Sequence, residues 1–259
     1  KDSFDPPLFI SGFFQEQHNP DSSDDEGHLL TQEELNQQNQ IEENEFKVMD
    51  EKIKIREYAF SSTNANFVWP NFNYQIDFIM SHLSLFTGRT ILELGTGTGI
   101  VPIFLRKKGL VVVSSDYDAP EITNNIDYNC KLNKILHSHI AHVWGTPFNF
   151  EQLQAERVRL EQALQTTAAP QLDIVIATDI LLYADQYPNL VNTLCQLLKP
   201  NNNAARETFT LDGEQYHYPF FLLNVARRLD TTPTFYKLAT EAGLVIKKKG
   251  KMVIITQAS

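Results

Sequence analysis

The sequence predicts an α/β fold built on a doubly wound, mostly parallel sheet of seven strands. From Thr90 onward, short apolar segments of strand length alternate with segments of helical periodicity. The turn after the first of these strands carries three glycines, Gly95, Gly97 and Gly99. Strands that alternate with helices form a parallel sheet covered on both faces, and such sheets bind ligands at the carboxyl ends of their strands.

Each element follows from its own pattern. Apolar, β-prone runs bounded by turn residues predict strands at 90–94, 110–116, 139–144, 172–179, 219–228, 244–250 and 251–258. Helical spacing predicts helices at 99–109, 119–133, 150–165, 187–199 and 232–243. The last two strands are separated by a short turn only, so the C-terminal strand is expected to be antiparallel.

Two further elements precede this series. Phe46 and Val48, then Ile53 and Ile55, alternate with polar residues around Asp50, which predicts an N-terminal β-hairpin. Residues 70–83 show helical spacing, with Pro70 in the first turn, where proline is tolerated. We therefore expect one domain over residues 46–259.

Residues 1–45 differ in composition from the rest of the chain. Residues 1–50 carry 13 acidic residues and only two lysines, whereas the whole chain has a net charge of −10. Residues 15–45 have few apolar side chains and predict a flexible acidic segment, preceded by a strand at 7–14. The remaining body is nearly neutral, so we expect no nucleic acid partner.

Composition also indicates in which cellular compartment the protein is expected. No apolar run approaches the roughly 20 residues of a membrane span, so no membrane association is expected. Two cysteines, Cys130 and Cys195, are too few for a disulfide framework. No secretory signal is recognisable, and no pattern indicates a metal site. We expect a monomer in the cytoplasm, with the nucleus as a second location.

The glycine turn is compatible with four interpretations. A phosphate-binding loop requires a Gly-Lys-Ser/Thr ending, which does not follow here. A dinucleotide site requires Gly-x-Gly-x-x-Gly, but Gly99 comes one residue early. An S-adenosylmethionine site needs a carboxylate near the cofactor's ammonium group, and Glu93 is suitably placed for it. A plain connecting turn leaves Glu93 without a role, so we favour S-adenosylmethionine.

Residues at other strand ends extend this site. Asp116 ends the second strand, where an acid binds the ribose hydroxyls of a nucleotide; the alternative is that it caps the next helix. Trp144 follows the third strand, where it either lines an adenine pocket or belongs to an exposed part of the core. Asp179 ends the fourth strand, where it either caps the next helix or faces the cleft and orients an acceptor amine.

With these residues in view, the chain resembles the seven-β-strand S-adenosylmethionine-dependent methyltransferases. Within them it is similar to the lysine methyltransferase-like group called methyltransferase family 16. The resemblance runs from about Phe46 to the C-terminus and rests on motifs in the family's order, "NFVWP", "LELGTGTG", "SSDYDAPEITNNIDYN", "HVWG" and "ATDILLY".

The resemblance implies roles for individual residues. Trp69 would border the cofactor, Asp116 would bind its ribose and Trp144 would lie beside its adenine. Thr178 would lie near the cofactor, and Asp179 would lie at the acceptor. Thr96 and Tyr117, which lie inside the same motifs, complete the expected set of cofactor-binding residues, together with Glu93, Gly95, Gly97 and Gly99.

The acceptor motif departs from the family pattern. The family often has Asp-x-x-Tyr after this strand, whereas Tyr183 stands one residue later, at the fourth position after Asp179. We expect both residues to be catalytic. The resemblance implies transfer of a methyl group to a lysine of a protein substrate, with S-adenosylhomocysteine as product.

Three other functions are considered. N-methylation of a small nicotinamide-like molecule uses the same cofactor. A catalytically silent binding module would keep Trp69, the glycines and Asp116, but retention of Asp179 and Tyr183 argues against it. An oxidoreductase that uses nicotinamide is disfavoured by the early position of Gly99.

Overall fold

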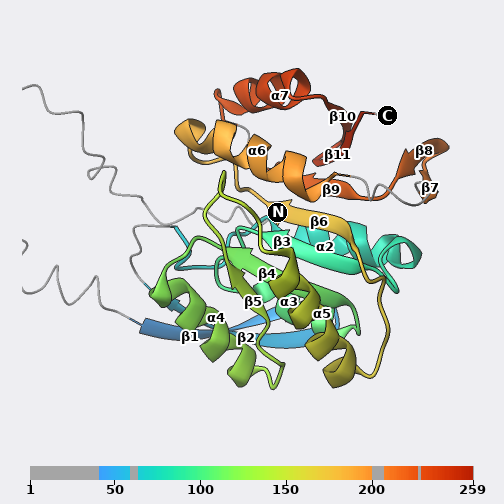
Figure 1. Ribbon diagram of the computed structural model, residues 1–259. Helices are drawn as coiled ribbons and strands as arrows, with labels where there is room; N and C mark the ends of the chain where they lie inside the picture. Colours follow the sequence, from blue (N-terminus) through green and yellow to red (C-terminus); the bar gives the residue numbers. More distant parts are fainter. Residues whose placement is uncertain (1–40, 59–63, 200–206, 227–228, 259) are drawn as a thin grey trace, which may run out of the picture.

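A seven-stranded sheet forms the centre of the computed structural model, which describes residues 41–58, 64–199, 207–226 and 229–258. The strand order is β10-β11-β9-β6-β3-β4-β5 (Figure 1). In chain order, the strands are β3 (Thr90–Leu94), β4 (Val111–Asp116), β5 (His139–Ala141), β6 (Leu172–Thr178), β9 (Phe220–Asn224), β10 (Leu244–Lys249) and β11 (Met252–Gln257). The strand β11 is antiparallel to both of its neighbours, β10 and β9, and the other pairs of this sheet are parallel. The predicted fold class is confirmed.

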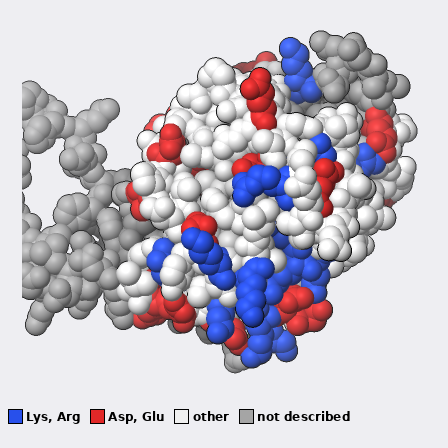
Figure 2. All heavy atoms as spheres, turned by 60° about the horizontal axis from the view of Figure 1, so that its bottom comes forward, with Lys and Arg blue, Asp and Glu red and all other residues white. Residues whose placement is uncertain are grey.

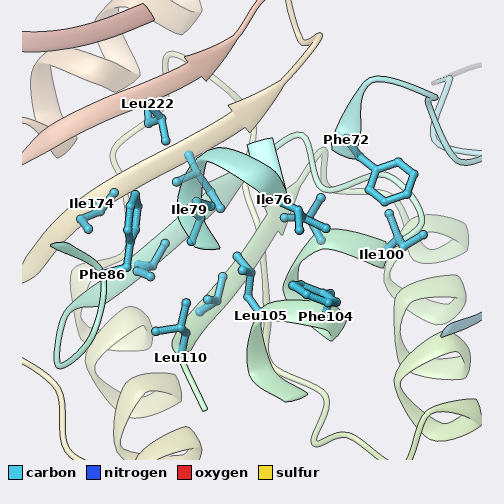
Figure 3. Packing of buried hydrophobic residues seen from close by; sticks show 14 of the residues in the cluster. Phe72, Ile76, Ile79, Phe86, Ile100, Phe104, Leu105, Leu110, Ile174 and Leu222 are labelled. Carbon is cyan, nitrogen blue, oxygen red and sulfur yellow. The ribbon is translucent and has the colours of Figure 1, made fainter. Parts of the chain in front are cut away.

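Helices cover both faces of this sheet. They are α2 (Phe72–Ser81), α3 (Ile100–Lys107), α4 (Pro120–Leu132), α5 (Phe150–Leu164), α6 (Tyr187–Leu197) and α7 (Thr232–Glu241), with short 3-10 turns η1 (Leu83–Leu85) and η2 (Ala184–Gln186). Alternate strand residues point to opposite faces, so Ile91 packs with α2, α3 and α4, whereas Leu92 packs with α5, α6 and α7. Figure 3 shows the first of these two cores, where Ile174 lies beside Phe86, and Phe104 lies near Leu105.

The strand order reverses next to β3. From β3 the chain proceeds outward to β4 and β5, then returns to β6 on the other side of β3. In parallel sheets, the segments that leave the carboxyl ends on either side of such a reversal diverge and leave a crevice. The residues that follow β3, β4 and β6 therefore meet at one edge of the sheet.

The N-terminal hairpin is longer than the sequence predicted. It consists of β1 (Ile41–Val48) and β2 (Glu51–Tyr58), so the ordered domain begins before the predicted boundary at residue 46. The acidic residues of β1 were assigned to the flexible segment, but Glu45 pairs across the hairpin with Lys52 at 2.7 Å. The strand predicted at 7–14 and the rest of the acidic segment, through residue 40, lie outside the described residues.

Four other strands differ from expectation. The pair β7 (Thr208–Leu211) and β8 (Glu214–His217) was not predicted, because each strand has only four residues and few of them are apolar. The aromatic rings of Phe209 and Tyr216 stack across this pair with centroids 5.4 Å apart. The strand β5 ends at Ala141, so Trp144 lies in the turn beyond it, and β9 is shorter than predicted at both ends.

A row of asparagines on α4 attaches the hairpin to the domain. The row repeats every four residues along one helix face and consists of Asn125, Asn129 and Asn133. The amide of Asn133 accepts from the N–H of Lys54 at 3.1 Å and donates to its carbonyl at 2.7 Å. Asn129 accepts from the N–H of Arg56 at 2.7 Å and donates to the carbonyl of Thr98 at 2.9 Å. The hairpin is thereby joined to the glycine turn.

Surface charges on this side of the molecule are mixed. Figure 2 turns the bottom of Figure 1 forward and shows basic and acidic side chains next to one another. The Nζ atom of Lys108, at the end of α3, lies 2.8 Å from Asp50 and 2.9 Å from Glu51 in the hairpin turn. Elsewhere, Lys247 pairs with Glu214 at 2.8 Å. Within the described ranges, none of the helices has the length and apolar character required to cross a membrane.

We predict that Asn129→Ala lowers the free energy of unfolding by about 2–4 kcal/mol, because two backbone groups lose a hydrogen-bond partner in a buried region. Asn129 is completely buried. Urea denaturation measures the change. The exposed Asn124→Ala on the same helix is the matched control and should leave stability nearly unchanged. Equal stability of the two variants would contradict the assignment of the asparagine row as the hairpin anchor.

Candidate active site

A cavity of about 500 Å³ opens at the carboxyl ends of β3, β4 and β6. Among the residues that line it are all but one of the predicted site residues, namely Trp69, Glu93, Gly95, Thr96, Gly97, Asp116, Tyr117, Trp144, Thr178, Asp179 and Tyr183. The exception is Gly99, which begins α3. Residues far apart in the sequence are thus brought together at the reversal of strand order.

The three glycines of the turn differ in what a side chain at each position would contact. A side chain on Gly95 would place its Cβ 2.5 Å from a methyl carbon of Ile180, so only glycine permits this close packing. Gly97 has a φ of +57°, and a Cβ there would meet no atom within 4 Å. Gly99 also has positive φ, but it faces Ile126 of α4 rather than the cavity. The expectation that Gly99 contacts the cofactor is therefore not matched by its position.

Glu93 is a buried carboxylate at the end of β3. Its Oε2 atom accepts a hydrogen bond from the hydroxyl of Thr96, the second residue of the turn. Burial raises the pKa of Glu93 to about 8, because an ionised carboxylate loses its hydration there, although the hydroxyl of Thr96 and the charge of Arg106 oppose this shift. At neutral pH the site therefore holds a proton that a bound cation would displace.

Asp116 lies opposite the glycine turn at the end of β4. One carboxylate oxygen accepts from the N–H of Gly97 at 2.7 Å, and the other accepts from the N–H of Tyr117 at 2.7 Å. Desolvation raises the pKa of Asp116, while these two donors lower it. Both oxygens are thus held in place at the cavity wall, and Tyr117 leaves its ring 53% exposed beside them.

The turn that follows β5 closes another side of the cavity. The N–H of His142 donates to the carbonyl of Asp116 at 2.9 Å, and burial lowers the pKa of the His142 ring. Trp144 follows two residues later and lines the cavity. The N–H of Gly145 donates to the hydroxyl of Thr193 at 2.8 Å, which fixes the turn. Trp144 therefore reaches the cavity from a turn and not from a strand.

Asp179 occupies a constrained position just after β6. Its φ is +50°, which is uncommon for a residue other than glycine, although aspartate tolerates it better than most. Its backbone N–H donates to the carbonyl of Asn224 at 3.0 Å, and its Oδ2 atom accepts from the side-chain amide of Asn71 at 2.6 Å. Asp179 is only 5% exposed. It faces the cavity and does not cap the helix that follows.

Thr178 and Tyr183 are held by residues that precede β3. The hydroxyl of Thr178 bonds to the side-chain amide of Gln75 from α2. The hydroxyl of Tyr183 accepts a hydrogen bond from the side-chain amide of Asn64. The backbone carbonyl of Asn64 in turn accepts from the indole N–H of Trp69 at 3.0 Å. Asn64 and Gln75 therefore support the side of the cavity that Thr178 and Tyr183 line.

Sequence reasoning missed several residues of this site. Asn64, Phe67, Phe72, His142, Val143 and Asp185 line the cavity, and Asn71 and Asn224 lie directly behind Asp179. Most of them have no motif of their own.

The charge of the cavity is strongly one-sided. Four carboxylates line it, those of Glu93, Asp116, Asp179 and Asp185, and the described lining residues include no lysine or arginine. An anionic pyrophosphate would be repelled by this set, whereas a sulfonium or ammonium group would be attracted. The site therefore fits a cationic nucleoside cofactor better than a dinucleotide.

Fold and site together define a methyltransferase of the α/β class. The family model described as "Lysine methyltransferase" matches residues 47–210. This match covers the second strand of the hairpin, the glycine turn and the motif around Asp179, and the chain belongs to this family.

Named relatives are similar over much of the chain. The protein N-terminal and lysine N-methyltransferase efm7 of Aspergillus fumigatus is 26% identical over 173 residues, 64% of this chain and 58% of that protein. The efm7 protein of Schizosaccharomyces pombe is 22% identical over 202 residues, 76% of this chain and 71% of that protein. The chain thus spans little more than half of the first of these relatives.

Solved structures support the fold. The T. Thermophilus 16S rRNA methyltransferase RsmC, in complex with AdoMet and guanosine, matches with a TM-score of 0.52 and 16% identity. The match covers 85% of this chain and 51% of that chain. At this identity the likeness shows the fold alone.

We predict that Glu93→Gln stabilises the cofactor-free protein increasingly as the pH rises. The folded pKa of Glu93 is raised from 4.5 to about 8, so the wild-type carboxylate costs no stability below pH 4.5 and costs most above pH 8. Each pKa unit corresponds to about 1.4 kcal/mol. Thermal unfolding at pH 5 and pH 8.5 measures the difference.

The exposed Glu151→Gln on α5 controls for loss of one negative charge. A difference in stability between Glu93→Gln and the wild type that does not change with pH would contradict the raised pKa of Glu93.

Proposed function

We propose that this protein transfers a methyl group from S-adenosylmethionine to a lysine side chain of a protein substrate. The observation that carries the proposal is the cavity at the strand ends, which has a glycine turn, four carboxylates and, among its described lining residues, no lysine or arginine. S-adenosylmethionine is a cation, and the amine that accepts the methyl group is a cation until it loses its proton. Membership of the lysine methyltransferase family supports the same reaction.

The residues present fit this cofactor. Asp116 offers two fixed carboxylate oxygens as acceptors for ribose hydroxyls. Glu93 would balance the ammonium charge of the methionine part, and Gly97 leaves open space at the turn. Trp69 and Trp144 supply flat apolar surface to the cavity lining. The bound cofactor supplies an activated methyl group.

The acceptor side would be formed by Asp179 and Tyr183. Methyl transfer needs a neutral amine, aligned with the methyl group and shielded from water. Asp179 is held through its side chain by Asn71 and through its backbone by Asn224. It would orient the amine and accept its proton. Tyr183 offers a hydroxyl oxygen, already fixed by Asn64, as a further hydrogen-bond partner. Positive charge on the substrate is also favoured near Asp185.

The protein substrate is the finer part of the proposal. The names of the fungal relatives give protein N-termini and lysines as their acceptors, and this supports an amine of a protein here. Membership of the family does not by itself determine the acceptor. A small amine remains the alternative, and the labelling experiment below separates the two.

We predict that Asp116→Ala weakens binding of S-adenosylhomocysteine by roughly tenfold or more, since hydrogen bonds to a charged group contribute about 1.5–3 kcal/mol. Asp179→Asn keeps the left-handed backbone and should bind the cofactor within about threefold of wild type while turnover falls sharply. Isothermal titration measures binding, with NAD as a comparison ligand. Tighter binding of NAD than of S-adenosylmethionine would refute the methyltransferase assignment.

We also predict that the protein labels protein in a cell lysate supplied with tritiated S-adenosylmethionine. Label is expected in gel bands, and Asp179→Asn should lower its rate of appearance. Heat-treated enzyme controls for methyltransferases already in the lysate. Label confined to the small-molecule fraction would contradict a protein acceptor and would support the small amine.

A further inference from the structure

A closed ring of hydrogen bonds lies behind the acceptor side of the cavity. The side-chain amide of Asn71 donates to Asp179 at 2.6 Å. The backbone N–H of Asp179 donates to the carbonyl of Asn224 at 3.0 Å. The side-chain amide of Asn224 in turn donates to the carbonyl of Asn71 at 2.7 Å. Three residues far apart in the sequence therefore fix one another.

We infer that Asn71 is a positioning residue that aims the carboxylate of Asp179 at the acceptor amine. This inference rests on the proposed function, because it assigns Asp179 to the acceptor. Asn71 does not line the cavity, although its neighbours Trp69 and Phe72 do. It therefore acts through Asp179 and not by contact with the substrate. Asn224 anchors both partners from the end of β9.

Asn71 stands at the start of α2, where the alternative to positioning Asp179 is a structural role as a helix cap. Asn71 is the N-cap residue of α2, where asparagine and aspartate usually stabilise a helix by accepting from a backbone N–H. Here Asn71 has helical φ and ψ, and its side chain makes no capping hydrogen bond. Its amide is instead directed to Asp179. The helix does not require this side chain, but the carboxylate does.

The ring also explains how Asp179 keeps its unusual backbone. A residue with φ of +50° is held only when its surroundings fix it, and such positions are common at functional sites. Asn224 fixes the backbone of Asp179 and Asn71 fixes its side chain. Because Asn224 is completely buried on a central strand, its substitution would disturb folding. Asn71 is only partly buried and is the better residue to test.

Two substitutions of Asn71 distinguish the roles. Asn71→Ala removes the donor, and Asn71→Asp replaces it with a second carboxylate that repels Asp179 across 2.6 Å. If Asn71 positions Asp179, total tritium transfer from S-adenosylmethionine in lysate should fall about tenfold or more in Asn71→Ala and further in Asn71→Asp. Binding of S-adenosylhomocysteine should stay within about threefold of wild type in both.

A role limited to helix capping gives the opposite order. Aspartate is as good an N-cap as asparagine, so Asn71→Asp would then retain more activity than Asn71→Ala, and this result would overturn the inference. The matched control is Asn73→Asp, which adds the same charge two residues later in the exposed first turn of α2. It should keep wild-type transfer.

A spectroscopic measurement keeps the inference testable if no transfer is found. The side-chain amide signals of Asn71 in a ¹H–¹⁵N spectrum should shift in Asp179→Asn and remain in place in Asp116→Ala. Unchanged signals in both would overturn the inference. Absence of transfer by the wild-type protein would instead refute the proposed function, so the two failures are distinguishable.

Discussion

Three carboxylates at the ends of three adjacent parallel strands are the constraint on which the site depends. Glu93, Asp116 and Asp179 belong to β3, β4 and the residue after β6, which the sheet topology brings to one edge. The negative charge of Asp116 helps to raise the pKa of Glu93, and burial removes the hydration of both carboxylates. The fold compensates with local donors, namely the hydroxyl of Thr96, two backbone N–H groups and the amide of Asn71. The charge is not neutralised by a lining lysine or arginine among the described residues, so it remains available to a cationic ligand.

This arrangement places a cost on the cofactor-free protein. The raised pKa of Glu93 means that its folded environment favours the protonated acid, and ionisation at neutral or higher pH destabilises the fold. A bound cation reverses that preference, because it supplies the charge that water would otherwise screen. Stability and cofactor binding are therefore coupled at the same carboxylate, as is common where a functional site is held in an unfavourable state.

The sequence was sufficient for the sheet and for the residues that line the cavity at the strand ends, because both follow from periodicity and from the positions where strands end. Asp116 and Asp179 could be located since a strand end fixes where its next residue lies. The early position of Gly99 helped to exclude a dinucleotide, yet Gly99 itself turns away from the cavity toward Ile126. The acidic part of β1 was missed because Glu42, Glu43 and Glu45 resemble a solvated segment, and only pairing with β2 shows them as a strand. The short pair β7 and β8 was also missed, although Phe209 and Leu211 alternate with threonines ahead of Asp212 and Gly213, which is a hairpin signal.

Several of the residues that the sequence could not supply are amides, and these amides share one property. Asn64, Asn71 and Asn129 each join segments that are distant in the chain, through a tyrosine hydroxyl, a carboxylate and two backbone groups respectively. An amide both donates and accepts, so it satisfies partners on either side without adding charge. That neutrality matters beside a cavity whose function depends on its negative charge. A lysine or arginine in place of Asn71 would hold Asp179 more strongly, but it would also cancel the charge that attracts the acceptor amine. The same property explains why these residues have no signature in the sequence, because a neutral amide on a helix or in a loop is ordinary until its partners are known.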